Sequence, residues 1–474
     1  FKGFIMSANN TLKINIPTIA TKQLKLQSCN AGKKLVVSTN WLPLFGFEAN
    51  AKIKEELIGI GKGIRVSLLE ANDTQGKKVY TREYKSRRNN PIETMLDMRS
   101  QNLINQAFPE DTEMVHIQFA YGEILITPMC NRKAAAIKQF KKSNNECFLA
   151  CSSGVDAVSM VKKGFKIDTL LEYRPNEKRD KNDMTETGAI NALANVEVKH
   201  LINEDIMNLD INKIAKLCSK SNYTNATLSL QCDDFSNSKA EKLKELSLED
   251  GSSSIDMVID AINIISKFNF PTVLIENVPN FFTSDAGKIL DLRLNRLGYK
   301  TYCDKFDARD YGGLTSRVRG YLFATMLPSD FEMPKPTKKN ETPIWKLLNL
   351  DERIASGELR DVTHTSSLQE GLKTGRARLL KRDSLYAPTV MKSQNRQAKD
   401  SLFIYNDVNN RYYFTSNKLL SELMGIEMNF DAVGKTLESE IVGQSIETPM
   451  HEALLDSINK HLIQSKQILS NKLF

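Results

Sequence analysis

The sequence is poor in the residues that form disulfides and hold metal ions. It has seven cysteines, an odd number with no CxxC pair, and five histidines without an HExxH or HxxxH pattern. A disulfide framework, a thiolate zinc site and metal catalysis are therefore not expected. No apolar run approaches the roughly 20 residues that cross a bilayer. These absences predict a soluble protein of a reducing cytoplasm, without a metal ion or a membrane partner.

Length and charge indicate what kind of globular protein this is. With 474 residues, of which 41% are hydrophobic, the chain exceeds what one hydrophobic core usually serves and predicts two or three domains. The formal net charge of +8 favours an anionic partner such as nucleic acid. The number of subunits stays open, with a monomer expected.

The N-terminal part, residues 1–140, predicts a small β-rich domain. Apolar alternations such as TLKINIP, GIRVSLLE and MVHIQFAYGEILITP are separated by polar turns, which is typical of short strands. The stretch NWLPLFGFEANAKI, followed later by GEILITP, resembles the small swapped-hairpin domains of bacterial antitoxins and transition-state regulators, many of which bind DNA. The polar, basic segment 131–146 predicts a linker or a connecting helix.

From Glu146 onward, short apolar runs alternate with amphipathic segments. The runs are CFLAC, DTLLEY, VEVKHLI, TLSLQC, TVLIENV and GYLFATM. Strands of this length, separated by helices, predict an α/β fold with a mostly parallel sheet covered on both faces. Ligands of such sheets gather at the carboxyl ends of the strands. Polar or reactive residues follow the first five runs: Ser152 and Gly154, Glu172, Asp205, Cys232, and Glu276.

Most of these residues also have a purely structural interpretation. The small residues after the first run form a common strand-to-helix joint, and Glu172 or Asp205 could cap a helix. Cys232 alone could be a buried core thiol. Glu276 is harder to explain in this way, because a carboxyl directly after an apolar run is partly desolvated. Desolvation raises the pKa of a carboxyl and suits it to donate a proton.

The ordered set of motifs resembles the DNA cytosine-C5 methyltransferases over about residues 147–462. ACSSGVDAVSMVKKGF resembles the glycine-rich first motif of that family, LLEY and EDI its cofactor contacts, and QCDDFS its Pro-Cys-Gln loop. FNFPTVLIENV resembles the Glu-Asn-Val strand, and the segment ending in TSRVRG resembles the Gln-x-Arg-x-Arg motif. APTV and VGQSIETPMHEALLDSI resemble the last two motifs. The resemblance implies a Rossmann-like class I methyltransferase fold and S-adenosylmethionine as the cofactor.

The resemblance also implies which residues act. The implied catalytic residues are Cys232, Glu276, Asn277, Arg317 and Arg319. The implied cofactor-binding residues are Ala150, Ser152, Gly154, Glu172, Tyr173, Asp205, Ile206, Gln444 and Ile446.

The implied reaction needs these residue types together. Carbon-5 of cytosine attacks a methyl sulfonium only after a thiolate, here that of Cys232, adds to carbon-6. Glu276 holds or delivers the proton at N3. Arg317 and Arg319 stand two apart on a strand, share one face and favour the thiolate. The target base must be flipped out of double-stranded DNA, beneath the polar, lysine-containing loop that follows the cysteine.

The sequence departs from the family at several motif positions. Gln231 replaces the proline before the cysteine, Asp233 the glutamine after it, and Thr315 the glutamine before the arginines. Two positions of the first motif and one of the last also differ: Ala150, Ser152 and Gln444. Two alternatives therefore stay open. One is a related enzyme that acts on RNA or uses an altered S-adenosylmethionine derivative, and the other is a non-catalytic DNA-binding relic.

Together, these patterns divide the chain into four parts. Residues 1–140 form the N-terminal domain, 146–327 the catalytic domain, 328–386 a target-recognition region, and 387–474 a segment that returns to the catalytic domain. The recognition region contains HTSSLQEGLKTGRARLLKRDS, whose basic side chains could contact phosphates or guanines. A solvated basic helix is the alternative. The resemblance further predicts a cytoplasmic protein of a prokaryotic cell or its phage.

Overall fold

The chain folds into two compact units, Phe1–Ala135 and Ala136–Phe474. The computed structural model describes residues 2–7, 10–70, 73, 76–86, 91–177, 180–237, 239–337 and 339–471, with side chains from residue 15 onward. The boundary between the units falls in the basic segment for which the sequence predicts a linker or connecting helix. This segment forms helix α2 (Arg132–Lys142).

The N-terminal unit consists mainly of antiparallel strands, which confirms the predicted β-rich region. One sheet has the order β4-β5-β10-β9, with bounds Gln27–Cys29, Gly32–Ser38, Ile92–Met98 and Tyr80–Glu83. The other has the order β3-β11-β12-β7-β6-β8, with bounds Ala20–Lys25, Met114–Ala120, Glu123–Pro128, Gly63–Leu68, Lys52–Gly59 and Lys77–Lys78. A separate pair joins β1 (Lys2–Ser7) to β2 (Asn10–Asn15), and the helices are α1 (Gln101–Ala107) and the 3-10 helix η1 (Leu42–Phe45).

Alternation of apolar and polar residues explains the core of this unit. In β11, Val115, Ile117 and Phe119 are buried while the residues between them are partly exposed. Strands of both sheets contribute to the same apolar cluster. With sheets of four and six strands, the unit is larger than the small swapped-hairpin domains that its sequence resembles.

The larger unit contains a seven-stranded sheet with the order β15-β14-β13-β16-β17-β19-β18. Its strands are His200–Ile202, Lys166–Leu171, Glu146–Ala150, Asn225–Ser229, Thr272–Asn277, Val318–Thr325 and Lys300–Asp307, in that order. The first five strands pair in parallel, and β19 pairs antiparallel with both of its neighbours. The mostly parallel sheet confirms the predicted α/β class.

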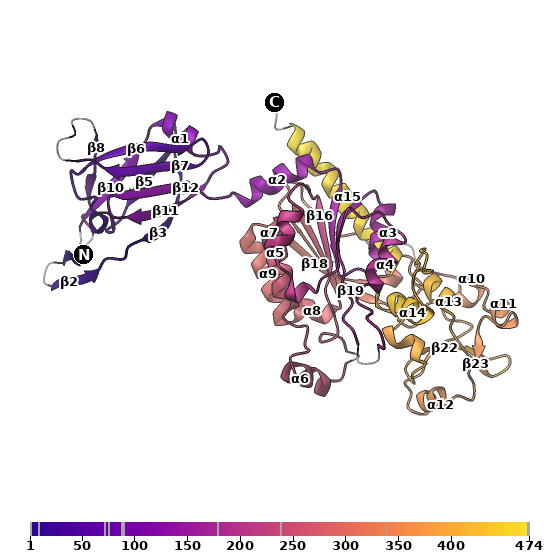
Figure 1. Cartoon of the computed structure of the whole chain (residues 1–474). Helices are drawn as coiled ribbons and strands as arrows, with labels where there is room; N and C mark the ends of the chain where they lie inside the picture. The colour runs from indigo at the N-terminus through magenta and orange to yellow at the C-terminus, as the bar shows by residue number, and fades with distance from the viewer. Residues whose placement is uncertain are drawn as a thin grey trace. The chain divides into compact units, whose positions relative to one another are not determined.

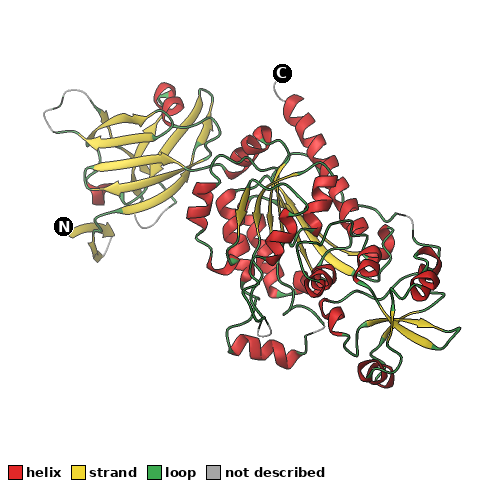
Figure 2. Cartoon of the chain, turned by 45° about the vertical axis from the view of Figure 1, so that its right-hand side comes forward, coloured by secondary structure: helices red, strands yellow, loops and turns green. Residues whose placement is uncertain are grey.

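Helices cover both faces of this sheet (Figure 2). One face packs against α5 (Ile211–Leu217), α7 (Met257–Phe268), α8 (Pro279–Thr283) and α9 (Asp285–Leu297). The other packs against α3 (Val155–Lys162), α4 (Thr187–Leu193) and the long α15 (Thr448–Asn471). Figure 1 shows α15, in yellow, beside α3, in magenta, although the sequence between them spans most of the unit.

A smaller sheet forms the rest of the larger unit. It has the order β20-β23-β22-β21, with bounds Arg360–Asp361, Arg411–Phe414, Leu402–Asn406 and Arg378–Leu380. Around it lie α10 (Ile344–Leu347), α11 (Leu350–Ala355), α12 (Ser366–Lys373), η4 (Lys392–Arg396), α13 (Asn417–Leu423) and α14 (Lys435–Gln444). The sheet continues past Tyr386, where the sequence prediction ends the target-recognition region. Among the described helices, none combines the length and the apolar character of a membrane span.

Candidate functional site

A cavity of about 380 Å³ lies at the carboxyl ends of the parallel strands. The segments that follow β13, β14, β15, β16 and β17 line it, together with the end of α14. Ten of the residues implied by the sequence line this cavity: Ser152, Glu172, Tyr173, Asp205, Ile206, Cys232, Glu276, Arg319, Gln444 and Ile446. Four others do not line it: Ala150, Gly154, Asn277 and Arg317.

The turn after β13 owes its shape to a glycine and a buried carboxylate. Gly154 has φ +111°, and a Cβ there would lie 2.9 Å from the Cα of Ala192, so the turn requires glycine. The Ser152 hydroxyl donates to Asp156 and accepts from the Gly154 N–H at 3.1 Å. Burial raises the pKa of Asp156 to about 6. Asp156 lines the cavity and was not predicted, although an acid inside the apolar start of a helix was a visible signal.

Glu172 follows β14 and is buried in the cavity wall. Burial, and then the neighbouring Asp156, raise the pKa of Glu172 to about 7. Ser153 donates a hydrogen bond to Glu172 Oε1 at 3.3 Å. A Cβ on Gly188 would collide with that same carboxylate, so this glycine allows α4 to approach it. The carboxylate is therefore fixed between two backbone segments at the cavity surface.

Asp205 both caps a helix and lines the cavity. Its carboxylate accepts the backbone N–H of Met207 at 3.0 Å and the Asn208 amide at 3.1 Å. These bonds match the capping interpretation of the sequence. Ile206, the first residue of the 3-10 helix η2 (Ile206–Asn208), lines the cavity beside it.

Cys232 lies in a turn just beyond β16 and faces the same cavity. Burial raises the pKa of the Cys232 thiol, and the positive charge of Arg319 lowers it by a smaller amount. Asn277, at the end of β17, donates from its side-chain amide to the carbonyl of Leu230 at 3.0 Å. Asn277 therefore positions the segment that carries the cysteine, from outside the cavity.

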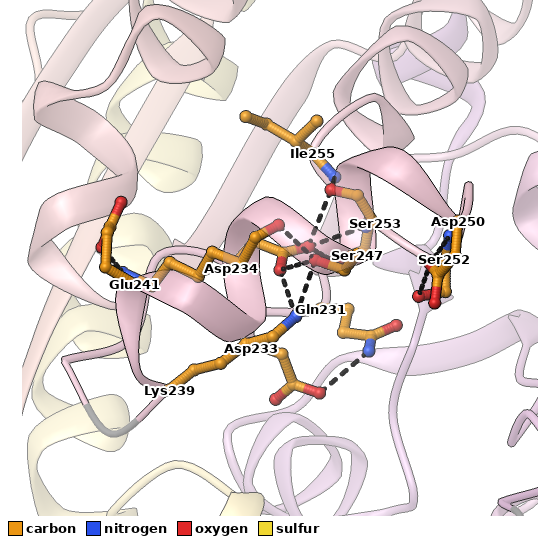
Figure 3. A network of polar contacts seen from close by, with 12 residues as sticks. Gln231, Asp233, Asp234, Lys239, Glu241, Ser247, Asp250, Ser252, Ser253 and Ile255 are labelled. Atoms are coloured by element: carbon orange, nitrogen blue, oxygen red, sulfur yellow. Dashed lines mark hydrogen bonds and ion pairs between the residues drawn. The ribbon is translucent and has the colours of Figure 1, made fainter.

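The loop after Cys232 is tied together by a single aspartate, as Figure 3 shows. Asp234 accepts from Lys239 Nζ at 2.5 Å, from the Ser253 hydroxyl at 3.0 Å and from the Ser254 N–H at 2.8 Å. Although burial raises its pKa, these hydrogen bonds lower the pKa of Asp234 to about 2. The loop, which includes α6 (Glu241–Glu249), is thus closed at its base.

Glu276 and Arg319 form an ion pair between adjacent strands at the cavity. Arg319 Nε lies 3.0 Å from Glu276 Oε1. Burial raises the pKa of Glu276, while Arg319 and Arg317 oppose that effect. A carboxyl with these two influences can hold a proton and return it, as a proton donor must.

Arg317 is buried and holds the C-terminal segments in place. Its guanidinium donates to the carbonyls of Val390 at 3.1 Å, Gly443 at 3.3 Å and Gln444 at 3.0 Å. The sequence places the two arginines on one strand face, but β19 begins at Val318, so Arg317 precedes the strand and only Arg319 reaches the cavity. The side chain of Gln444 lines the cavity while its carbonyl accepts from Arg317.

A buried carboxylate accompanies the departure at Thr315. Glu447 accepts the Thr315 hydroxyl at 2.8 Å and the Thr315 N–H at 3.3 Å. Burial raises the pKa of Glu447 to about 7. The pair joins the start of α15 to the segment before β19. Glu447 was not predicted, because its partner lies 132 residues away in sequence.

Two arginines of the basic stretch in the recognition region have structural partners. Arg378 donates to the carbonyl of Asp400 at 2.6 Å. Arg382 forms an ion pair with Asp351 at 3.0 Å, and its guanidinium lies 4.2 Å from the centre of the Trp345 ring. Neither contact needs a nucleic acid. In the described part of the chain, no group of three or more His, Cys, Asp or Glu side chains is arranged to hold a metal ion.

Comparison with known proteins gives a family match and several structural neighbours. A family model described as C-5 cytosine-specific DNA methylase matches residues 193–460. The solved structure of Dnmt2 methyltransferase from S. pombe has a TM-score of 0.51 and 16% identity, over 66% of this chain and 97% of that one. The methyltransferase EhMeth of Entamoeba histolytica has a TM-score of 0.49 and 18% identity, over 68% and 99%. No curated protein matches the chain. At 16% sequence identity, the similarity to the S. pombe structure shows a shared fold and nothing more.

Proposed function

The chain belongs to the C-5 cytosine-specific DNA methylase family, whose cofactor is S-adenosylmethionine, and we propose that it methylates carbon-5 of cytosine in double-stranded DNA through a covalent bond to Cys232. One observation carries this proposal. The Cys232 thiol, the Glu276 carboxyl and the acidic residues Glu172 and Asp205 all face a single cavity. A nucleophile, a proton donor and a cofactor pocket are the parts that the reaction needs.

The cavity suits S-adenosylmethionine, which supplies the methyl group when bound. Its volume of about 380 Å³ is within the range of small-molecule sites. Glu172 would accept the ribose hydroxyls, and Asp205 with Ile206 would contact the adenine. Gln444 and Ile446 would border the methionine portion, which the family places at this motif.

The chain's own residues then account for activation of the base. The Cys232 thiolate forms a bond from Sγ to carbon-6, and the electron pair displaced from the carbon-5–carbon-6 double bond makes carbon-5 nucleophilic. Glu276 supplies a proton to N3, which neutralises the charge that develops there. Arg319 pairs with Glu276, and its charge also lowers the pKa of the Cys232 thiol. When Glu276 takes up a proton, the charge of Arg319 is left to stabilise the thiolate.

Release of the product reverses the first bond. Once carbon-5 carries the methyl group, a base removes the carbon-5 proton and the Sγ–carbon-6 bond breaks. Its electron pair returns to sulfur, the N3 proton returns to Glu276, and the aromatic ring is restored. Water can act as this base.

Nucleoside analysis tests the proposal directly. We expect incubation with S-adenosylmethionine carrying a labelled methyl group and with mixed duplex DNA to yield labelled 5-methylcytosine, identified by mass spectrometry. The same incubation with RNA distinguishes the alternative substrate. Label found only in RNA would overturn the proposal, and so would the absence of label from both nucleic acids.

We expect Asp205→Ala to weaken S-adenosylmethionine binding by about 1–3 kcal/mol, the usual cost of losing a partner for a buried polar group. Calorimetry of the folded variant measures this. Asp210→Ala is the matched control, because Asp210 caps α5 through the N–H groups of Asn212 and Lys213 but does not line the cavity. Equal affinities for the two variants would reduce Asp205 to a helix cap.

A further inference from the structure

The excess positive charge of the chain lies almost entirely in the N-terminal unit. Residues 1–135 contain 19 Lys and Arg against 12 Asp and Glu, a net charge of +7. Residues 136–474 contain 46 against 45, a net charge of +1. A unit close to neutral has little long-range attraction for a phosphate backbone. The general attraction of this chain for a polyanion therefore resides in the unit without the cavity.

Within that unit, the positive charge is concentrated around β9. The sequence KKVYTREYKSRR, residues 77–88, has six basic residues and one acidic residue. Arg87 and Arg88 fall outside the described residues. The exposed or partly exposed side chains of the described part include Lys78, Tyr80, Arg82, Tyr84 and Lys85, and we call these five residues the β9 surface. The exposed Glu83 lies among them.

The backbone gives this surface a regular geometry. β9 is the edge strand of the four-stranded sheet, and all four of its residues are exposed. Its register pairs Tyr80 with Met95 and Arg82 with Glu93, on the face opposite to the buried Leu96. The guanidinium of Arg82 lies 5.0 Å from the centre of the Tyr84 ring. Tyr80, Arg82 and Tyr84 thus alternate along one side of the chain, while Lys78 belongs to β8 before it and Lys85 follows Tyr84.

We propose that the β9 surface binds the phosphate backbone of the double-stranded DNA on which the catalytic unit acts. The proposal rests on the proposed function for the identity of the nucleic acid. Arg82, Lys78 and Lys85 supply cations, and tyrosine hydroxyls donate to phosphate oxygens. Charged residues on an edge strand also prevent pairing with other chains. That role does not need Tyr80, whose side chain is 47% exposed beside them.

Charge reversal in the full-length chain tests the surface. We expect the double variant Arg82→Glu with Lys85→Glu to bind a fluorescein-labelled duplex of mixed sequence roughly tenfold more weakly than the unchanged chain. Loss of two phosphate contacts also reduces the slope of log affinity against log salt concentration by about 2. Fluorescence anisotropy at several salt concentrations measures both quantities. The turnover rate at saturating DNA should stay unchanged, because neither residue belongs to the cavity.

A matched variant distinguishes the effect of the β9 surface on DNA affinity from the effect of the total charge of the chain. Lys25→Glu with Lys62→Glu changes the charge equally, and both lysines are exposed on the six-stranded sheet or its β6–β7 turn. A much smaller loss of affinity in this control supports the proposal. An equal loss in the two double variants, or no loss in the first, overturns it.

The binding measurement needs no methyl transfer, so the two proposals can fail separately. If the chain binds duplex DNA through the β9 surface but forms no 5-methylcytosine, the inference stands and the proposed function falls. If it methylates DNA and the Arg82 and Lys85 variant binds normally, the function stands and this inference falls. Stronger binding to a matched RNA duplex than to DNA would overturn the choice of partner.

Discussion

Replacement of Cys232 by alanine is expected to abolish methyl transfer, with a loss of more than roughly 10⁴-fold in turnover, the scale on which an enzyme suffers when its nucleophile is removed. Without the thiolate no bond forms to carbon-6, and carbon-5 stays too weak a nucleophile to take the methyl group. The measurement is labelled methyl incorporation into DNA at saturating substrate. Retention of DNA binding by the variant shows that the loss concerns chemistry. Activity within tenfold of the unchanged chain would contradict the covalent mechanism.

DNA that contains 5-fluorocytosine should trap the covalent intermediate, which can then be detected by its mass. Fluorine cannot leave carbon-5 as a proton does, so the enzyme should remain bound through Cys232 after methyl transfer. Intact-mass analysis followed by peptide mapping locates the adduct. Cys151 provides the control, because it also lines the cavity and burial raises the pKa of its thiol strongly. Cys151→Ala should still form the adduct, whereas an adduct mapped to Cys151 would refute the assignment.

Replacement of Glu276 by glutamine is expected to lower turnover by about 10²–10⁴-fold, the usual contribution of a general acid. It should also change the shape of the pH profile. A carboxyl ordinarily titrates about four pH units below a thiol, and burial raises the pKa of both Glu276 and Cys232. In the resting enzyme we therefore expect the proton on the thiol. The active form has the same total number of protons, but its proton is on the Glu276 carboxyl and the Cys232 thiol is ionised.

The direction in which activity changes on each side of the pH profile follows from the single proton that Glu276 and Cys232 share in the active form. Activity of the unchanged enzyme should rise as the pH passes the pKa of Glu276 and fall as it passes that of Cys232, which gives a bell shape. In Glu276→Gln only the thiolate matters, so activity should rise with pH and lose its alkaline limb. Glu440→Gln alters another buried acid of the cavity wall and should keep the bell. A bell-shaped profile in Glu276→Gln would remove Glu276 from the proton transfer.

Strand ends were predictable from the sequence because they are local features. The apolar runs that precede Glu172, Asp205, Cys232 and Glu276 place each residue at the same edge of a parallel sheet, whatever the order of the strands. The cavity unites them there. The family resemblance added Gln444 and Ile446, which no local pattern would have brought to that edge.

Residues that depend on distant partners could not be found in this way. Arg317 was expected to favour the thiolate, and its charge does lower the pKa of Cys232, but two of its guanidinium nitrogens donate to carbonyls 73 to 127 residues further along the chain, which no local pattern indicates. Glu447 becomes meaningful only once the fold brings Thr315 to it. Asp234 looks like an ordinary loop acid with Lys239 nearby, and only the fold brings its further partners Ser253 and Ser254 to it. In each case tertiary contact, rather than local preference, decides the role of the side chain.

The position of α15 beside α3 has a consequence for synthesis of the protein. All seven strands of the large sheet are complete at Thr325, yet the helix that covers much of one face begins about 120 residues later, at Thr448. At typical elongation rates that interval lasts on the order of ten seconds. During that time apolar side chains of the sheet remain uncovered on the ribosome, where a chaperone has time to bind them. Ile446, the last residue of the sequence that lines the cavity, is made at nearly the same moment, so the cavity lacks part of its wall until then.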